Sequence, residues 1–127
     1  MKRIILDTNF LLIPGQFKVD IFEEIRRISN FMYQLCIIDK SLEELEKIIT
    51  TGNTKDKTAA RIALKLIKLK KIAKIKTTGN KNVDDLIMDL ASKDGIVATQ
   101  DKELKQKLRK RSIPIIILKQ KKYLSMA

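Results

Sequence analysis

The sequence predicts an α/β fold with a central, mostly parallel sheet of five strands that helices cover on both faces. Short apolar runs rich in Ile, Val and Leu alternate with longer segments of helical periodicity. These apolar runs are nearly continuous, as expected for strands that are buried on both sides. The chain has 127 residues, 44% of them hydrophobic, which is enough for one domain with its own core.

The first half of the chain is predicted to contain two strands and three helices. A β-branched run that ends at Asp7 predicts a buried first strand, and the pair Pro14-Gly15 predicts a loop after it. Apolar residues at intervals of three or four positions indicate the helices. The expected order is a strand at residues 3–6, a loop at 7–17, a helix at 18–32, a strand at 34–38, a helix capped by Asp39 or Ser41 that ends near 51, and a helix at 55–71.

The second half alternates strands and helices in the same way. The expected order is a strand at residues 72–75, a polar loop at 77–82, a helix from 83 to near Gly95, a strand at 96–99, a helix at 102–111 and a strand at 114–118. No repeat or internal boundary divides the chain, so residues 1–118 are predicted to form a single domain. Residues 119–127 are predicted to be a loose, basic C-terminal tail.

The composition excludes several classes of protein. No apolar segment approaches the roughly 20 residues of a membrane span, and the N-terminus lacks the pattern of a signal peptide. A single Cys cannot form an internal disulfide, so we expect a cytoplasmic location and no membrane partner. The absence of His excludes Ser-His-Asp and Cys-His nucleophile systems and a Cys/His zinc site. Catalysis must therefore use carboxylates, hydroxyl groups, Lys or a metal ion held by oxygen.

The charge of the chain points to a polyanionic partner, with nucleic acid as the first candidate. There are 27 Lys and Arg against 15 Asp and Glu, for a formal net charge of +12. Residues 55–76 and 102–122 each carry nine basic residues and one acid. They are either solvated helix faces or a phosphate-binding surface, and two such segments on one small domain favour the second. The candidate residues for binding nucleic acid are Lys65, Lys68, Lys105 and Arg109.

Several acidic residues are expected at one edge of the sheet. In open parallel sheets, ligands bind beyond the carboxyl ends of the strands. That rule places Asp7, Asp39 and Asp101 near one edge, because each follows a predicted strand. As alternatives, Asp7 only begins a turn and Asp101 only caps the next helix. No glycine-rich phosphate loop follows the first strand, which argues against a nucleotide site.

Helical periodicity selects further acids near this edge. In the helix that begins at residue 83, Asp84 lies about 95° from the centre of the apolar stripe and Asp85 about 165° away, so Asp84 is the better candidate. In the helix after the second strand, the same reasoning leaves Glu44 and Glu46 as alternatives. Converging carboxylates repel one another, and Mg²⁺ or Mn²⁺ would relieve the repulsion and activate water for attack on a phosphodiester.

Four segments of the chain together resemble the PIN-domain nucleases. They are ILDTNFLL, SLEEL, VDDLIMDLA and IVATQDKELKQKLRKRSIPIIIL, and they cover nearly the whole chain in order. PIN domains are three-layer α/β/α folds with a central parallel sheet, and they act as Mg²⁺- or Mn²⁺-dependent ribonucleases. The resemblance implies this fold and activity here. It implies catalytic and metal-binding roles for Asp7, Glu44, Asp84 and Asp101, and site-shaping roles for Thr8, Asn9 and Thr99.

Two branches of that family are similar to this chain. The segment LLIPGQFKVDIFEEI resembles archaeal relatives of the eukaryotic PIN proteins that process small-subunit rRNA. The size and motifs also resemble VapC toxins, which cleave tRNA or rRNA. The resemblance implies RNA as substrate, and a second copy of the chain, an antitoxin or a ribosome-assembly factor as candidate partners. The alternative is a non-catalytic PIN domain that binds RNA or the ribosome, and the presence of all four acids favours the enzyme.

Overall fold

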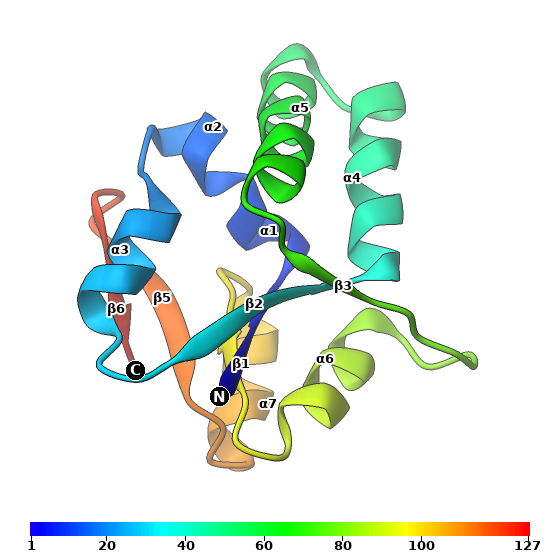
Figure 1. Ribbon diagram of the computed structural model, residues 1–127. Coiled ribbons are helices and arrows are strands. Elements are labelled where there is room, and N and C mark those ends of the chain that lie inside the picture. Colours follow the sequence, from blue (N-terminus) through cyan, green and yellow to red (C-terminus); the bar gives the residue numbers. More distant parts are fainter.

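The computed structural model describes residues 1–127 and is built around one six-stranded sheet (Figure 1). The strands lie in the order β3-β2-β1-β4-β5-β6. Neighbouring strands are parallel except β5 and β6, which pair antiparallel at one edge. The strand bounds are β1 Lys2–Leu6, β2 Tyr33–Ile38, β3 Ala73–Ile75, β4 Ile96–Ala98, β5 Ile115–Lys119 and β6 Tyr123–Met126.

Seven helices cover the two faces of this sheet. Their bounds are α1 Thr8–Leu11, α2 Ile13–Phe17, α3 Ile21–Ile28, α4 Asp39–Thr51, α5 Thr54–Leu69, α6 Val83–Ala91 and α7 Lys102–Lys110. The first five helices pack on one face, and α6 and α7 pack on the other (Figure 1). None of the helices combines the length and the apolar character that crossing a membrane requires.

Alternate residues of the central strands enter two separate cores, which explains why these strands are apolar throughout. In β1, Ile4 and Leu6 pack toward α1–α5, whereas Ile5 packs toward α6 and α7. In β4, Ile96 and Val97 divide between the two cores in the same way. The predicted α/β/α layers are confirmed, and each of the five predicted strands lies within one residue of its expected bounds.

The prediction of a loop at residues 7–17 is wrong, because this segment forms α1 and α2. Asp7 is the N-cap of α1, and Pro14 occupies the first turn of α2, where a missing N–H is tolerated. Gly15 allows α2 to approach α5 closely, since a Cβ at this position would lie 2.6 Å from the Cα of Ala59. The Pro-Gly pair therefore serves helix packing.

The prediction of a loose tail at residues 119–127 is also wrong, because these residues complete the sheet. Lys119 ends β5, and Tyr123–Met126 pair antiparallel with it as β6. In the three-residue connection at 120–122, Gln120 and Lys121 have positive φ angles of 53° and 55°, as at the two central residues of a type I′ turn. The sheet therefore has six strands, and the sixth is the antiparallel one.

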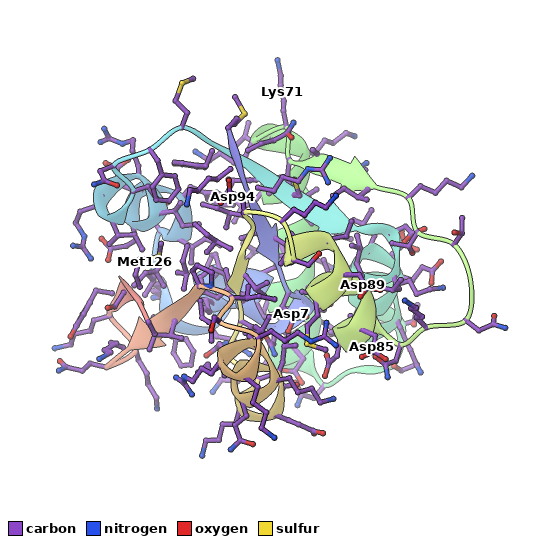
Figure 2. All side chains as sticks on the ribbon, turned by 90° about the horizontal axis from the view of Figure 1, so that it is seen from below. Asp7, Lys71, Asp85, Asp89, Asp94 and Met126 are labelled. Carbon is purple, nitrogen blue, oxygen red and sulfur yellow. The ribbon has the colours of Figure 1, made fainter.

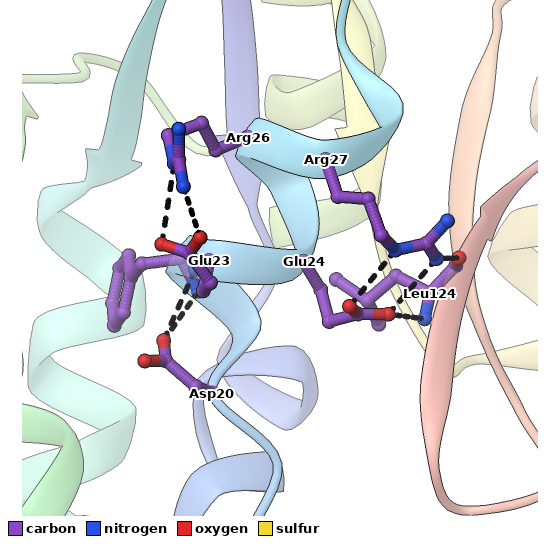
Figure 3. A network of polar contacts seen from close by, with 7 residues as sticks. Asp20, Glu23, Glu24, Arg26, Arg27 and Leu124 are labelled. Carbon is purple, nitrogen blue, oxygen red and sulfur yellow. Dashed lines mark hydrogen bonds and ion pairs between the residues drawn. The ribbon is translucent and has the colours of Figure 1, made fainter.

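Helix α3 holds the edge strand β6 in place, as Figure 3 shows. The Glu24 carboxylate accepts a hydrogen bond from the backbone N–H of Leu124 at 2.9 Å, and the Arg27 guanidinium donates to the Leu124 carbonyl at 3.0 Å. Arg27 also donates to Glu24 at 2.9 Å, so one ion pair binds both backbone groups of Leu124. Covering an edge strand in this way protects it from pairing with other chains.

Candidate active site

An open pocket of about 240 Å³ lies at the carboxyl edge of the sheet, and four acidic side chains from separate elements line it. The acids are Asp7 after β1, Glu44 on α4, Asp84 on α6 and Asp101 before α7. Thr8 and Asn9 line the same pocket. The fold thus brings together the acids that the sequence suggested, although they are far apart along the chain.

Asp7 has the most fixed carboxylate of the pocket, and it is only 6% exposed. Its Oδ1 accepts a hydrogen bond from the backbone N–H of Thr8 at 2.9 Å, and its Oδ2 accepts one from the Thr99 hydroxyl at 2.7 Å. Its own N–H donates to the Ala98 carbonyl at 2.9 Å, which extends the pairing of β1 with β4. The orientation of both carboxylate oxygens is therefore set by the protein.

Thr99 and Asn9 join the ends of β1 and β4. The fully buried Thr99 hydroxyl donates to Asp7 and accepts a hydrogen bond from the N–H of Asp101 at 3.1 Å, so it contacts two of the acidic residues. The Asn9 side-chain oxygen accepts from the N–H of Gln100 at 3.1 Å, and the Gln100 amide donates to the Asn9 carbonyl at 3.1 Å. Gln100 is a shaping residue that the sequence did not single out.

Asp101 caps α7 and faces the pocket at the same time. Its Oδ1 accepts hydrogen bonds from the N–H groups of Glu103 at 2.9 Å and Leu104 at 3.2 Å. Its Oδ2 accepts no hydrogen bond from the protein. The two interpretations of Asp101 are therefore compatible, because capping uses one oxygen and leaves the other available.

The structure distinguishes between neighbouring acids on α4 and α6. Asp84 lines the pocket whereas Asp85 does not, and Glu44 lines it whereas Glu46 does not. In Figure 2, Asp85 and Asp89 lie on α6, to the right of Asp7. Asp84 therefore has the orientation that helical periodicity indicated.

Asp39 follows β2 at the same edge, as expected, but it lies outside the pocket. Its carboxylate accepts hydrogen bonds from the Thr77 hydroxyl at 2.5 Å and the Thr77 N–H at 3.1 Å. These two bonds are the main reason that the pKa of Asp39 is lowered. Asp39 therefore anchors the segment that follows β3 and does not join the acidic cluster.

Burial and mutual repulsion raise the pKa of three of the four carboxyl groups. Burial is the main cause at Asp7, where the two hydrogen bonds to its oxygens oppose it and the charges of Asp84 and Asp101 add to it. Burial also raises the pKa of Glu44, with the charge of Asp7 as the second cause. At Asp84 the order is burial and then the charge of Asp101. Each of these groups senses the charge of another, so they form one electrostatic cluster.

The chemistry of the pocket fits Mg²⁺ or Mn²⁺, which prefer oxygen ligands. Four carboxylates supply the oxygens, and Thr8 contributes a hydroxyl group beside Glu44. No three acidic side chains lie close enough together to hold one ion directly. An ion in this pocket would therefore contact one or two carboxylates and keep several water molecules, which is the usual binding mode of Mg²⁺.

Two lysines flank the acids, and the sequence did not single out either of them. The Nζ of Lys107 on α7 lies 3.8 Å from Oδ2 of Asp84. The charge of Lys47 on α4 lowers the pKa of Glu44, although burial outweighs this effect. Lys47 follows Glu44 by one helical turn, so spacing alone could have indicated it. Lys107 gives no such signal, because the flank of α7 that faces α6 depends on tertiary packing.

The four basic residues that were predicted to bind RNA do not line the pocket. Lys65 and Lys68 are exposed on α5, Arg109 is exposed on α7, and Lys105 is half-buried beside it. Burial lowers the pKa of Lys105, and the charges of Arg109 and Lys102 act in the same direction. Their contact with RNA stays a prediction.

Comparisons with known proteins show the relatives of this chain. Residues 4–121 match a family model described as a PIN like domain. The chain is 36% identical to Ribonuclease VapC4 of Methanocaldococcus jannaschii, over 97% of this chain and 95% of that protein. It is 35% identical to Ribonuclease VapC9 of Archaeoglobus fulgidus, over 96% of this chain and 87% of that protein. It is 34% identical to the rRNA-processing protein fcf1 of Schizosaccharomyces pombe, over 90% of this chain but only 57% of that longer protein.

The fold also matches a solved structure, that of the PIN domain endonuclease Utp24. The TM-score is 0.80 at 32% sequence identity, and the match covers 98% of this chain and 90% of the other. The chain belongs to the PIN-like domain family.

Proposed function

We propose that this protein is a metal-dependent endoribonuclease that hydrolyses phosphodiester bonds in RNA. The observation that carries the proposal is the convergence of four carboxylates in one open pocket of a strongly basic protein. Two relatives of nearly the same length are named ribonucleases, and Utp24 is described as an endonuclease. An acidic pocket would hold the metal, and the basic surface around it would attract the polyanionic substrate.

Asp7, Glu44, Asp84 and Asp101 would hold Mg²⁺ or Mn²⁺, one or two of them directly and the others through bound water, and the ion would supply Lewis acidity at the phosphate and lower the pKa of a bound water. Asp7 contributes a carboxylate that its two hydrogen bonds hold in one orientation. Asp101 contributes Oδ2, which no protein group occupies. The pKa values of Glu44 and Asp84 are raised, which is typical of clustered carboxylates whose mutual repulsion a bound cation would relieve.

The names of the relatives support two biological roles for this activity. VapC4 and VapC9 are ribonucleases, and fcf1 is an rRNA-processing protein. The proposed substrate is rRNA or tRNA, and the candidate protein partners are an antitoxin, a ribosome-assembly factor or a second copy of the chain. A non-catalytic RNA-binding domain would have no need for all four acids in one pocket, so the structure favours the enzyme.

The nucleic acid is proposed to reach the pocket along the basic helices α5 and α7. Each of the four predicted RNA-binding residues would contact phosphates and therefore contribute affinity without selecting a base sequence. They are Lys65, Lys68, Lys105 and Arg109.

Cleavage assays with one pair of matched variants test the proposal. Asp84→Asn should reduce Mn²⁺-dependent cleavage of a labelled RNA by about 10²-fold or more, because it removes charge aimed at the reacting centre. Asp85→Asn makes the same change on the same helix outside the pocket and should retain activity. Full activity in Asp84→Asn together with loss in Asp85→Asn would contradict the site assignment. Cleavage that persists in EDTA would contradict the metal dependence.

A further inference from the structure

Lys107 is the basic residue whose charged group lies within ion-pair distance of the acidic pocket. Its Nζ is 3.8 Å from Oδ2 of Asp84 and 3.8 Å from Oε1 of Glu103. None of the other salt bridges in the protein involves a pocket acid. Helices α6 and α7, which carry the two partners, pack side by side on one face of the sheet (Figure 1).

The contacts of Lys107 are too loose for a structural ion pair. Both distances exceed the roughly 2.7–3.2 Å of a hydrogen bond from nitrogen to oxygen. The side chain is 41% exposed, and ion pairs of this kind contribute little to stability. By contrast, the surface pair of Lys81 with Asp89 closes to 2.6 Å. The ammonium group of Lys107 is therefore shared by two carboxylates and held firmly by neither.

We propose that Lys107 binds a phosphate of the RNA strand on the Asp84 side of the pocket and so sets which phosphodiester lies over the acids. This inference rests on the proposed function. Four carboxylates repel an incoming phosphate, and a cationic group at their border offsets that repulsion. Lysine suits this task because it carries a compact charge on a flexible stem. A phosphate oxygen competes with Asp84 and Glu103 for the same ammonium and can accept a charge-assisted hydrogen bond from it.

The position of Lys107 distinguishes it from the other cations of α7. Lys105 and Arg109 lie two residues before and after it, so helical geometry turns both of them about 160° away. Neither of them forms an ion pair with a pocket acid. Lys110 lies in the last turn of the same helix, is exposed and makes no ion pair. Lys110 is therefore a control that removes the same charge from nearly the same place.

The test measures the binding of a labelled single-stranded RNA oligonucleotide in the presence of Mn²⁺. The Asp7→Asn background prevents cleavage during the measurement, and Asp101→Asn serves as a second background. Lys107→Gln should weaken binding by roughly tenfold, the effect of one charge-assisted hydrogen bond, whereas Lys110→Gln should have little effect. The slope of log affinity against log salt should fall by about 0.7 in Lys107→Gln, as expected for one lost phosphate contact on a single strand. Lys107→Arg should retain most of the affinity.

Equal affinities and equal slopes for Lys107→Gln and Lys110→Gln would overturn the inference, because only net charge would then matter. A parallel measurement follows the rise in melting temperature that Mn²⁺ induces. A smaller rise in Lys107→Gln than in its background would also overturn the inference, since Lys107 would then act by holding Asp84 in place. Failure of the proposed function is detected separately, as the absence of Mn²⁺-dependent cleavage by the parent protein, and it leaves the binding comparison intact.

Discussion

Replacing Asp7 with Asn should stabilise the metal-free protein at neutral pH, although it alters a buried residue. Burial raises the pKa of Asp7 despite two hydrogen bonds, so the ionised carboxylate is less favourable in the folded state than in the unfolded state. The amide removes this charge and keeps the shape of the side chain. Its NH₂ group can donate to the Thr99 hydroxyl, which can then turn to the Asn9 side-chain oxygen at 3.4 Å.

The expected gain in stability follows from the balance between the two hydrogen bonds of Asp7 and the cost of burying its charge near other acids. Each of the two hydrogen bonds contributes about 0.5–1.5 kcal/mol, and the raised pKa shows that burial and repulsion outweigh their sum. We therefore expect Asp7→Asn to raise the free energy of unfolding by about 0.5–2 kcal/mol, which lies within the usual range of single substitutions. At this chain length, 1 kcal/mol corresponds to a shift of about 4 °C in melting temperature.

The raised pKa of Asp7 also predicts how the stability of the parent protein changes with pH. The folded pKa of Asp7 lies above its ordinary value of 3.8, so the parent protein is relatively more stable in acid and loses this stability as pH rises through the folded pKa. The pKa values of Glu44 and Asp84 are raised as well and act in the same direction. The difference in stability between the parent and Asp7→Asn should therefore grow as pH rises above 3.8, the ordinary pKa of Asp7. It should become constant once the pH exceeds the folded pKa.

Thermal melting in EDTA across this pH range measures the effect, and Asp85→Asn controls for the change in net charge. Added Mn²⁺ should stabilise the parent by about 2.7 kcal/mol at a concentration of 100 times the dissociation constant, and the Asp7→Asn variant less. A variant that melts below both the parent and Asp85→Asn at pH 7 would refute the proposed repulsion. The absence of any Mn²⁺ effect on the parent would refute the metal site.

The strands β1, β2, β4 and β5 could be predicted from the sequence because their buried residues form continuous apolar runs. The two helices α1 and α2 could not, because helices of four and five residues are too short for an apolar period to repeat. Pro14-Gly15 indicated a turn, yet the glycine is required by the backbone of Ala59 on a distant helix. The strand β6 was hidden for a similar reason, since its contacts with Glu24 are fixed only by the tertiary fold.

The candidate site was predictable to the extent that it depends on local geometry. Asp7 and Asp101 follow strands, and a helical wheel separates Asp84 from Asp85. The choice between Glu44 and Glu46 needed the family resemblance, because both flank the same apolar stripe. Lys107 could not be found at all, because the distance between its charge and Asp84 depends on how α6 and α7 pack together. Contacts between elements are the part of the site that a single sequence leaves open.

Three further predictions test the packing and the site. Gly15→Ala should lower the free energy of unfolding in urea by about 1–3 kcal/mol, because its Cβ would lie 2.6 Å from the Cα of Ala59. Replacing both Lys65 and Lys68 with Gln should weaken RNA binding equally for all sequences and reduce the salt slope by about 1.4, and an unchanged slope would make α5 a solvated face. Thr99→Val keeps the volume of the side chain but removes the donor to Asp7 and the acceptor for the N–H of Asp101. Cleavage or metal affinity should fall by about 10–100-fold, the usual effect of removing a group that orients a metal ligand. Thr99→Ser restores the hydroxyl and should recover most of the activity. Equal rates for the Val and Ser variants would show that shape alone holds Asp7 in place.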